Sequence, residues 1–154
     1  MIRTLATVAA FAGLMAAIGC APKDDGPRVV AKGKLLDNGK PYVYEAPKGK
    51  GGAAIPPPSA GSSGTGLQIQ FTPVEGGDTY YAAFNGESSA FEVKGNDGKG
   101  IKPGKYKVFL TVVGGPPGTP EIFNGKFNRD KSKIERDIAV DGPEIIIDVS
   151  KPAG

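Results

Sequence analysis

The hydrophobic residues of this chain recur mainly at every second position, in short runs that turn-forming residues separate. In the clearest run, residues 105–112, the apolar even-numbered positions are Tyr106, Val108, Leu110 and Val112. A second run places Leu67, Ile69 and Phe71 on one face and ends at Pro73. Because successive side chains of a strand point to opposite faces, this period of two predicts β-strands whose apolar face covers a core.

Turn signals divide the rest of the chain into further strand-like segments. Asn-Gly pairs at positions 38–39 and 85–86 favour tight hairpins, because both residue types tolerate a positive φ. Runs rich in apolar and β-branched residues lie beside these and later turns, at residues 28–36, 41–44, 79–84, 89–94, 134–140 and 144–150. We find no convincing helix. About seven to eight short strands predict an all-β fold, an antiparallel β-sandwich of the immunoglobulin-like type.

Glycine and proline bear on which parts of the chain fold. The sequence has 24 Gly and 14 Pro, a content at which disorder has to be considered unless these residues are confined to turns and linkers. They concentrate in residues 47–66, which we predict to be a flexible insertion. The alternative is that the three prolines at 56–58 form a polyproline segment docked on outward tyrosines. We expect the folded domain to span residues 28–150, followed by a short tail at 151–154.

The inventory of reactive side chains excludes several classes of function. The chain has no His and no Trp, and Cys20 is its only cysteine. This removes histidine-based catalysis, Cys/His zinc sites and internal disulfides. Because the oxygen-rich segments 96–98 and 124–130 also lack the ligand spacing of calcium loops, we expect no catalytic residue, no metal site and no cofactor. The formal net charge of +3 is spread along the chain, which does not indicate a nucleic-acid partner.

The strand carboxylates fall mainly at outward positions, so we expect them to be solvated. They are Glu92, Glu135, Asp137, Glu144 and Asp148. Asp148 lies between Ile147 and Val149, which the alternation places in the core, so its own side chain should face water. That orientation argues against a self-formed amide cross-link from Lys32 or Lys34 to Asp148, because such a bond needs a dry core.

The first 20 residues have the layout of an export signal. A basic start with Arg3 precedes an uncharged apolar stretch, residues 5–18, and the small residue Gly19 precedes Cys20. A helix of this stretch spans ~21 Å, short of the ~30 Å hydrocarbon core, so a permanent membrane span is disfavoured. Residues 17–20 resemble the bacterial lipobox, whose cysteine is acylated before signal peptidase II cleaves ahead of it. The alternative is an ordinary secretory signal that ends near a cysteine.

The likeness to a lipobox implies a lipid-anchored protein. Cys20 would carry more than one acyl chain, whereas a single chain gives only marginal membrane binding. Residues 21–27 are short, charged and bounded by proline, which predicts a tether between the lipid and the domain. The expected location is the cell envelope, on a membrane that faces the periplasm or on the outer membrane.

Several short motifs resemble those of the transthyretin-like, carboxypeptidase-regulatory-like domains of bacterial lipoproteins. They read GKLLDNGKP, LQIQFTP, NGESSAFEV, PGKYKV and FNRDKS, at residues 33–41, 67–73, 85–93, 103–108 and 127–132. The resemblance covers residues 28–150 and implies a prealbumin-like β-sandwich of about seven strands, from a family with no activity established for it as a whole. One enzyme with this fold, hydroxyisourate hydrolase, is built on histidines that this chain lacks.

Aromatic residues at outward positions are the remaining candidates for a binding surface. Tyr42 and Tyr44 share one face of their segment. Tyr81 is expected to point outward on the following hairpin, and Phe109 outward on the strand at 105–112, so these rings are candidates to bind a polysaccharide or an envelope protein. The alternative is that the rings pair across strands or lie beneath the loop at 114–128. The expected function is a non-catalytic structural or interaction module, with a carbohydrate- or protein-binding module as the alternative.

Overall fold

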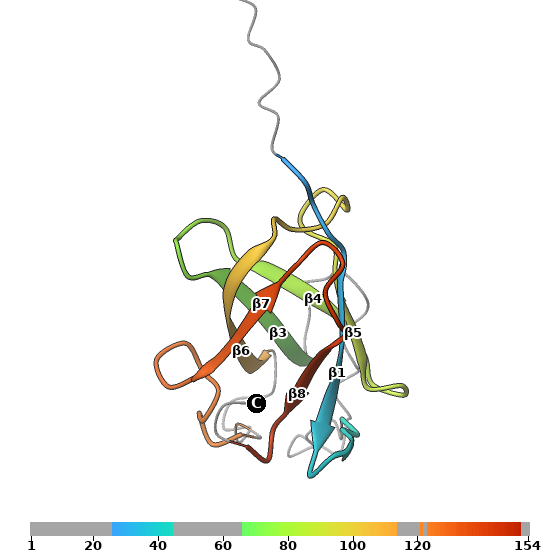
Figure 1. Cartoon of the computed structure of the whole chain (residues 1–154). Helices are drawn as coiled ribbons and strands as arrows, with labels where there is room; N and C mark the ends of the chain where they lie inside the picture. Colours follow the sequence, from blue (N-terminus) through green and yellow to red (C-terminus); the bar gives the residue numbers. More distant parts are fainter. Residues whose placement is uncertain (1–25, 45–65, 114–120, 122, 152–154) are drawn as a thin grey trace, which may run out of the picture.

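The computed structural model describes residues 26–44, 66–113, 121 and 123–151, and within these ranges the chain forms eight β-strands and no helix (Figure 1). The strands are β1 (Ala31–Asp37), β2 (Lys40–Pro41), β3 (Gly66–Pro73), β4 (Tyr80–Asn85), β5 (Ala90–Val93), β6 (Gly104–Val113), β7 (Ile134–Ile138) and β8 (Ile145–Asp148). The all-β prediction is confirmed. The predicted signal at 1–20 and nearly all of the insertion predicted at 47–66 lie outside the described residues.

The strands form one sheet in the order β2-β1-β5-β4-β3-β6-β7, and β8 pairs with β1. Six of the seven strand pairs are antiparallel, and the β1–β8 pair is parallel. Gly33 and Lys34 pair with both β5 and β8, so these two strands lie on opposite edges of β1. The antiparallel prediction therefore fails for β8, which pairs with the first strand and not with its neighbour in sequence, β7.

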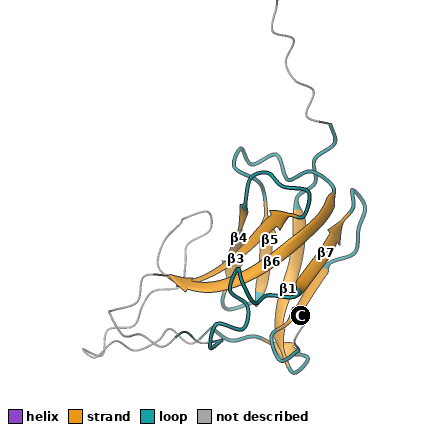
Figure 2. Cartoon of the chain, turned by 90° about the vertical axis from the view of Figure 1, so that its left-hand side faces the viewer, coloured by secondary structure: helices purple, strands orange, loops and turns teal. Residues whose placement is uncertain are grey.

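β4 is the corner at which the sheet curls. Its first half, Tyr80 to Ala82, pairs with β3, and its second half, Ala83 to Asn85, pairs with β5. A strand that changes partner along its length bends the sheet to which it belongs. The result is a half-barrel, open between β7 and β8, with the core inside the curl. Figure 2 shows the curled sheet from the side.

The predicted alternation holds in the core. Tyr106, Val108 and Leu110 are at most 2% exposed, and the inward residues of β3 are Leu67, Ile69 and Phe71, at most 1% exposed. The Phe71 ring lies 5.9 Å from the Phe91 ring and 6.4 Å from the Tyr106 ring, centroid to centroid. Aromatic pairs at such distances contribute about 0.5–1.5 kcal/mol beyond their buried area, so these rings link β3, β5 and β6.

The first predicted Asn-Gly turn is confirmed. Asn38 and Gly39 have φ values of 50° and 76°, and Asp37 pairs with Lys40 across them. Two consecutive positive φ values define a type I′ turn, whose twist matches that of the flanking strands. The β1–β2 hairpin therefore has the geometry that its sequence predicts.

The second hairpin is confirmed, but its turn is of a different kind. Residues 86–89 separate the paired Asn85 and Ala90, and the positive φ falls on Ser89, at 55°. The Asn85 side-chain oxygen accepts the N–H groups of Glu87 and Ser88 at 2.9 and 3.1 Å. Because this side chain bonds the backbone ahead of it, the turn begins as an Asx turn and Gly86 needs no positive φ.

The last part of the loop at 114–128 contributes to the core. Residues 114–120 lie outside the described residues, but Phe127 is fully buried. Its carbonyl accepts the Leu110 N–H at 2.9 Å, and its ring lies 5.4 Å from that of Phe123. An isolated aromatic residue in a turn-rich segment has no periodic neighbours, so the alternation could not reveal that it fills the core.

Gly33 provides a test of the packing between β1, β5 and β8. A Cβ at this position would overlap the Phe91 ring and the Ile145 carbonyl. We expect Gly33→Ala to destabilise the domain by at least ~1–3 kcal/mol, the usual cost of overpacking, in urea unfolding. Gly86→Ala is the control, because the nearest atom there, the Tyr44 Cβ, is 3.8 Å away. Equal unfolding midpoints for the two variants would contradict the close approach.

Candidate functional site

Two of the four predicted surface aromatics are partly buried against the core. Tyr42 and Tyr44, which follow β2, are half-buried and pack against the core cluster. The Tyr42 ring lies 5.8 Å from that of Phe123. The Tyr44 hydroxyl is buried, has no hydrogen-bond partner among the described residues, and has a pKa that burial raises. The prediction that these two rings form an exposed surface is therefore wrong, and the alternative of burial applies to them.

The other two predicted aromatics, Tyr81 and Phe109, share the outer face of the half-barrel. Each lies directly beside Gln70 of β3, Tyr81 on the β4 side and Phe109 on the β6 side. Tyr81 is 51% exposed, as expected, but Phe109 is only 4% exposed. Phe109 does face away from the core, yet the prediction that its ring is available at the surface is wrong.

Two cationic side chains lie over the Phe109 ring and cover part of it. Lys107 Nζ and Arg129 Cζ lie 5.7 and 5.6 Å from the centre of the ring. Long cationic side chains commonly lay their stems on apolar surface and stabilise the contact through the ring's negative face. Alternation along a strand predicts which face a residue occupies, but not whether a distant residue such as Arg129 lies over it.

A gap between β7 and β8 was not anticipated from the sequence, and Arg136 spans it. Its Nη2 and Nε donate to the Ile146 carbonyl of β8 at 2.8 and 3.2 Å. Its Nη1 donates to the Glu135 carbonyl at 2.8 Å, and burial lowers the pKa of the guanidinium. Arg136 alternates with Ile134 and Ile138, so its side chain starts on the inner face of β7. The hydrogen bonds of one side chain thus take the place of the backbone hydrogen bonds that would otherwise join β7 and β8.

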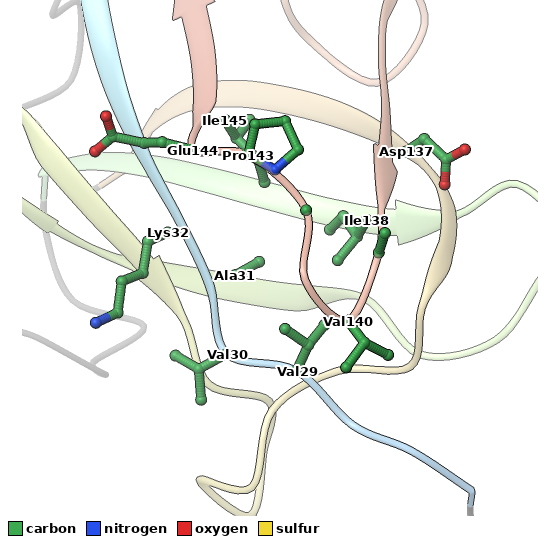
Figure 3. A pocket seen from close by; sticks show the side chains of 12 residues that line it. Val29, Val30, Ala31, Lys32, Asp137, Ile138, Val140, Pro143, Glu144 and Ile145 are labelled. Carbon is green, nitrogen blue, oxygen red and sulfur yellow. The ribbon is translucent and has the colours of Figure 1, made fainter.

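A cavity of about 300 Å³ lies at one end of this gap (Figure 3). Its lining includes three core residues, Ala31, Ile138 and Ile145, each at most 7% exposed. In Figure 3, the Lys32 and Glu144 side chains lie on one side of the cavity and Asp137 on the other. An apolar floor without convergent polar groups suits an apolar side chain or an acyl group better than a reaction that needs paired acid and base.

The expectation that the Asp148 side chain faces water is wrong, because this side chain is only 6% exposed. Its carboxylate accepts four hydrogen bonds at 2.6–3.1 Å, from the N–H groups of Asn38, Gly39 and Ser150 and from the Ser150 hydroxyl. These bonds, that of the Ser150 hydroxyl above all, hold the pKa of Asp148 below its usual range. Parallel pairing of Leu36 with Asp148 brings the carboxylate to the β1–β2 turn, where it ties β8 to that turn.

The lysines considered for a cross-link do not approach Asp148. Lys34 Nζ pairs with Glu144 at 3.2 Å, and Lys32 Nζ with Glu92 at 3.6 Å. Both pairs are at the surface, where an ion pair contributes about 0–1 kcal/mol. Asp148 is held by hydrogen bonds to the β1–β2 turn and to Ser150, and the two lysines on β1 pair with other carboxylates.

No family model, curated protein or solved structure matches the chain. Within the described ranges, no three His, Cys, Asp or Glu side chains gather to bind a metal ion. The same ranges contain no helix with the length and apolarity to cross a membrane. The likeness to transthyretin-like domains therefore depends on the sequence motifs alone.

Asp148→Asn should weaken the dependence of the free energy of unfolding on pH in the acidic range. A carboxylate with a lowered native pKa stabilises the fold above its unfolded pKa of about 3.9, and this contribution is lost as the pH falls through the native pKa. We expect the stability difference between wild type and Asp148→Asn, measured by urea unfolding, to be largest above about pH 4–5 and to shrink below it. Using the difference removes the similar effects of Glu92 and Asp97, whose pKa values are also lowered. A difference that is constant with pH would refute this role.

Arg136→Met should loosen β8 while leaving the rest of the sheet in place. Methionine keeps an apolar stem but removes the donors to the Ile146 and Glu135 carbonyls. Hydrogen exchange should therefore become faster at the amides of β8, with β3 and β6 unchanged, and self-association should increase because two strand edges lose their cover. Lys133→Met, an exposed cation just before β7, is the control. Unchanged exchange in β8 would show that Arg136 does not hold the gap closed.

Proposed function

We propose that the protein is a lipid-anchored component of the bacterial cell envelope whose β-domain is a non-catalytic structural or interaction module. The observation that carries this proposal is the position of Cys20, the only cysteine of the chain, directly after an apolar signal-like stretch. A thiol at this point has no disulfide partner in the chain and fits the acylation site of a lipobox. Acylation would hold the domain at a membrane of the envelope, periplasm-facing or outer.

The proposed family is that of transthyretin-like domains, with the finer architecture of a β-sandwich. Under this proposal, β1, β2, β5 and β8 make up one layer and β3, β6 and β7 the other, with β4 shared between them. The motif at residues 37–41 supports it because it forms the type I′ hairpin, and that at 103–108 because it begins β6. The proposed domain boundaries remain 28–150, with a tether at 21–27.

A second candidate function is the binding of a carbohydrate or an envelope protein at the outer face. Tyr81, 51% exposed, favours it, because Tyr81 pairs with Gln70 across β3 and β4 on the same outer face. The Gln70 amide donates to Thr111 Oγ1 at 3.2 Å and is thereby fixed in orientation. A ring next to an oriented amide is a combination that can hold a sugar, the ring by stacking and the amide by hydrogen bonding.

Cys20→Ser tests the proposed anchor. Serine cannot form the thioether to the lipid, so we expect the variant to leave the detergent phase in phase partitioning, or to remain as an unprocessed precursor. Mass spectrometry of the wild-type protein should show acyl chains on Cys20. Ala21→Ser, next to the same position, is the matched control and should behave as wild type. A Cys20→Ser protein that stays in the detergent phase at the wild-type mass would contradict the lipid anchor.

A further inference from the structure

We propose that one end of the half-barrel is a docking surface for lipid headgroups, so that the domain sits on the membrane in a fixed orientation. The surface consists of the three segments 74–79, 94–103 and 139–144, and is called here the entry end. The inference deepens the proposed function and depends on the lipid anchor at Cys20.

The topology gathers the three segments where the described chain begins. β1 starts at this end, β3, β5 and β7 finish there, and β4, β6 and β8 start there (Figure 1). Val29 and Ile101 exchange two backbone hydrogen bonds, both of 2.9 Å. Arg28 Nη1 lies 3.4 Å from Asp97 Oδ2. The residues that follow the predicted tether are therefore fixed directly to the segment 94–103.

The length of the tether limits how far this end can be from the lipid. At ~3.3–3.6 Å per residue, the residues from Ala21 to Pro27 reach at most ~25 Å even when fully extended. β1 then carries the chain away from the entry end for the length of Ala31–Asp37, which is about 20 Å at ~3.3 Å per residue. The β1–β2 turn and the segment 86–89 thus lie at the opposite end, about 20 Å farther along the chain from the point where the tether joins the domain.

The entry end also carries apolar side chains where turns usually have polar ones. Val74 and Val140 are turn residues, and they are 53% and 51% exposed. Lys99 and Lys102 are exposed in the segment between β5 and β6. Exposed apolar residues accompanied by lysines suit the boundary between headgroups and acyl chains.

The contact is weak by itself and becomes effective through the tether. Carboxylates outnumber lysines in the three segments, five to three, so charge alone would not bring the domain to the membrane. An anchor at Cys20 makes the second contact intramolecular, which raises the effective concentration of headgroups near Val74 and Val140. The cavity at the end of the gap between β7 and β8 includes Val140 and Pro143 in its lining and so belongs to the same end.

Single-cysteine labelling tests the orientation in the full acylated protein. Acylation occupies the thiol of Cys20, so a fluorophore reacts only with a cysteine introduced at the position of interest. Asp141→Cys places the probe at the entry end, and Glu87→Cys, also an exposed acidic turn residue, places it at the opposite end. In phosphatidylcholine vesicles that contain a headgroup-nitroxide lipid, we expect several-fold stronger quenching at position 141 than at 87.

A second pair of variants separates docking from mere proximity through the tether. Val74→Ser together with Val140→Ser should reduce the quenching at position 141 severalfold while flotation with vesicles is unchanged. Val43→Ser, 70% exposed and distant from the entry end, is the control and should leave the quenching as it was. Equal quenching at 141 and 87, or no effect of the double substitution, in protein that floats with vesicles would overturn the docking surface alone. Wild-type protein that does not float with vesicles would overturn the anchor and the docking surface together.

Discussion

The parallel pairing of β8 with β1 is the constraint on which the half-barrel depends. β1 is already paired with β5, so β8 takes its other edge, and this places β7 and β8 at opposite edges of one sheet. The short segment 139–144 must nevertheless join them, which is geometrically feasible only because the sheet curls until its edges approach each other. The close approach at Gly33 and the carboxylate of Asp148 hold β8 in this position.

Arg136 protects the edge strands β7 and β8 against pairing with strands of other chains. Unpaired strand edges are templates for association, and natural sheets often protect them with a charge that points inward. Here the cation does more than repel, because its hydrogen bonds occupy the Ile146 and Glu135 carbonyls along the gap. The protection of the edges and the closure of the curl therefore reside in one side chain.

Much of the fold could be predicted because alternation and turn chemistry act locally. The inward faces of β3 and β6 and the Asn38-Gly39 turn follow from residues next to one another in sequence. Where the prediction fails, a distant residue decides the outcome. In β8 the alternation is right that Ile147 lies in the core and that Ile146, 42% exposed, faces outward. It is wrong only for Asp148, whose carboxylate the backbone N–H groups of the distant β1–β2 turn bind and bury.

The candidate site was less predictable than the fold for the same reason. The sequence identifies aromatic positions, but the exposure of Tyr81 and the burial of Phe109 depend on which remote side chains cover them. An arginine between two inward isoleucines in β7 was the available signal for the gap, since a charge at an inward position needs a specific partner. Alternation alone does not say that this partner is a backbone carbonyl of the next strand.

The parallel arrangement of β1 and β8 also sets how the domain responds to a pulling force. Both strands run from the entry end towards the opposite end, so the chain enters at one end of this pair and leaves it at the other. A force applied between the N-terminal segment and the C-terminal end therefore acts along the strands and loads their hydrogen bonds in shear, all at once, instead of opening them one after another. A β-domain connected in this way resists extension between the start of β1 and the end of β8.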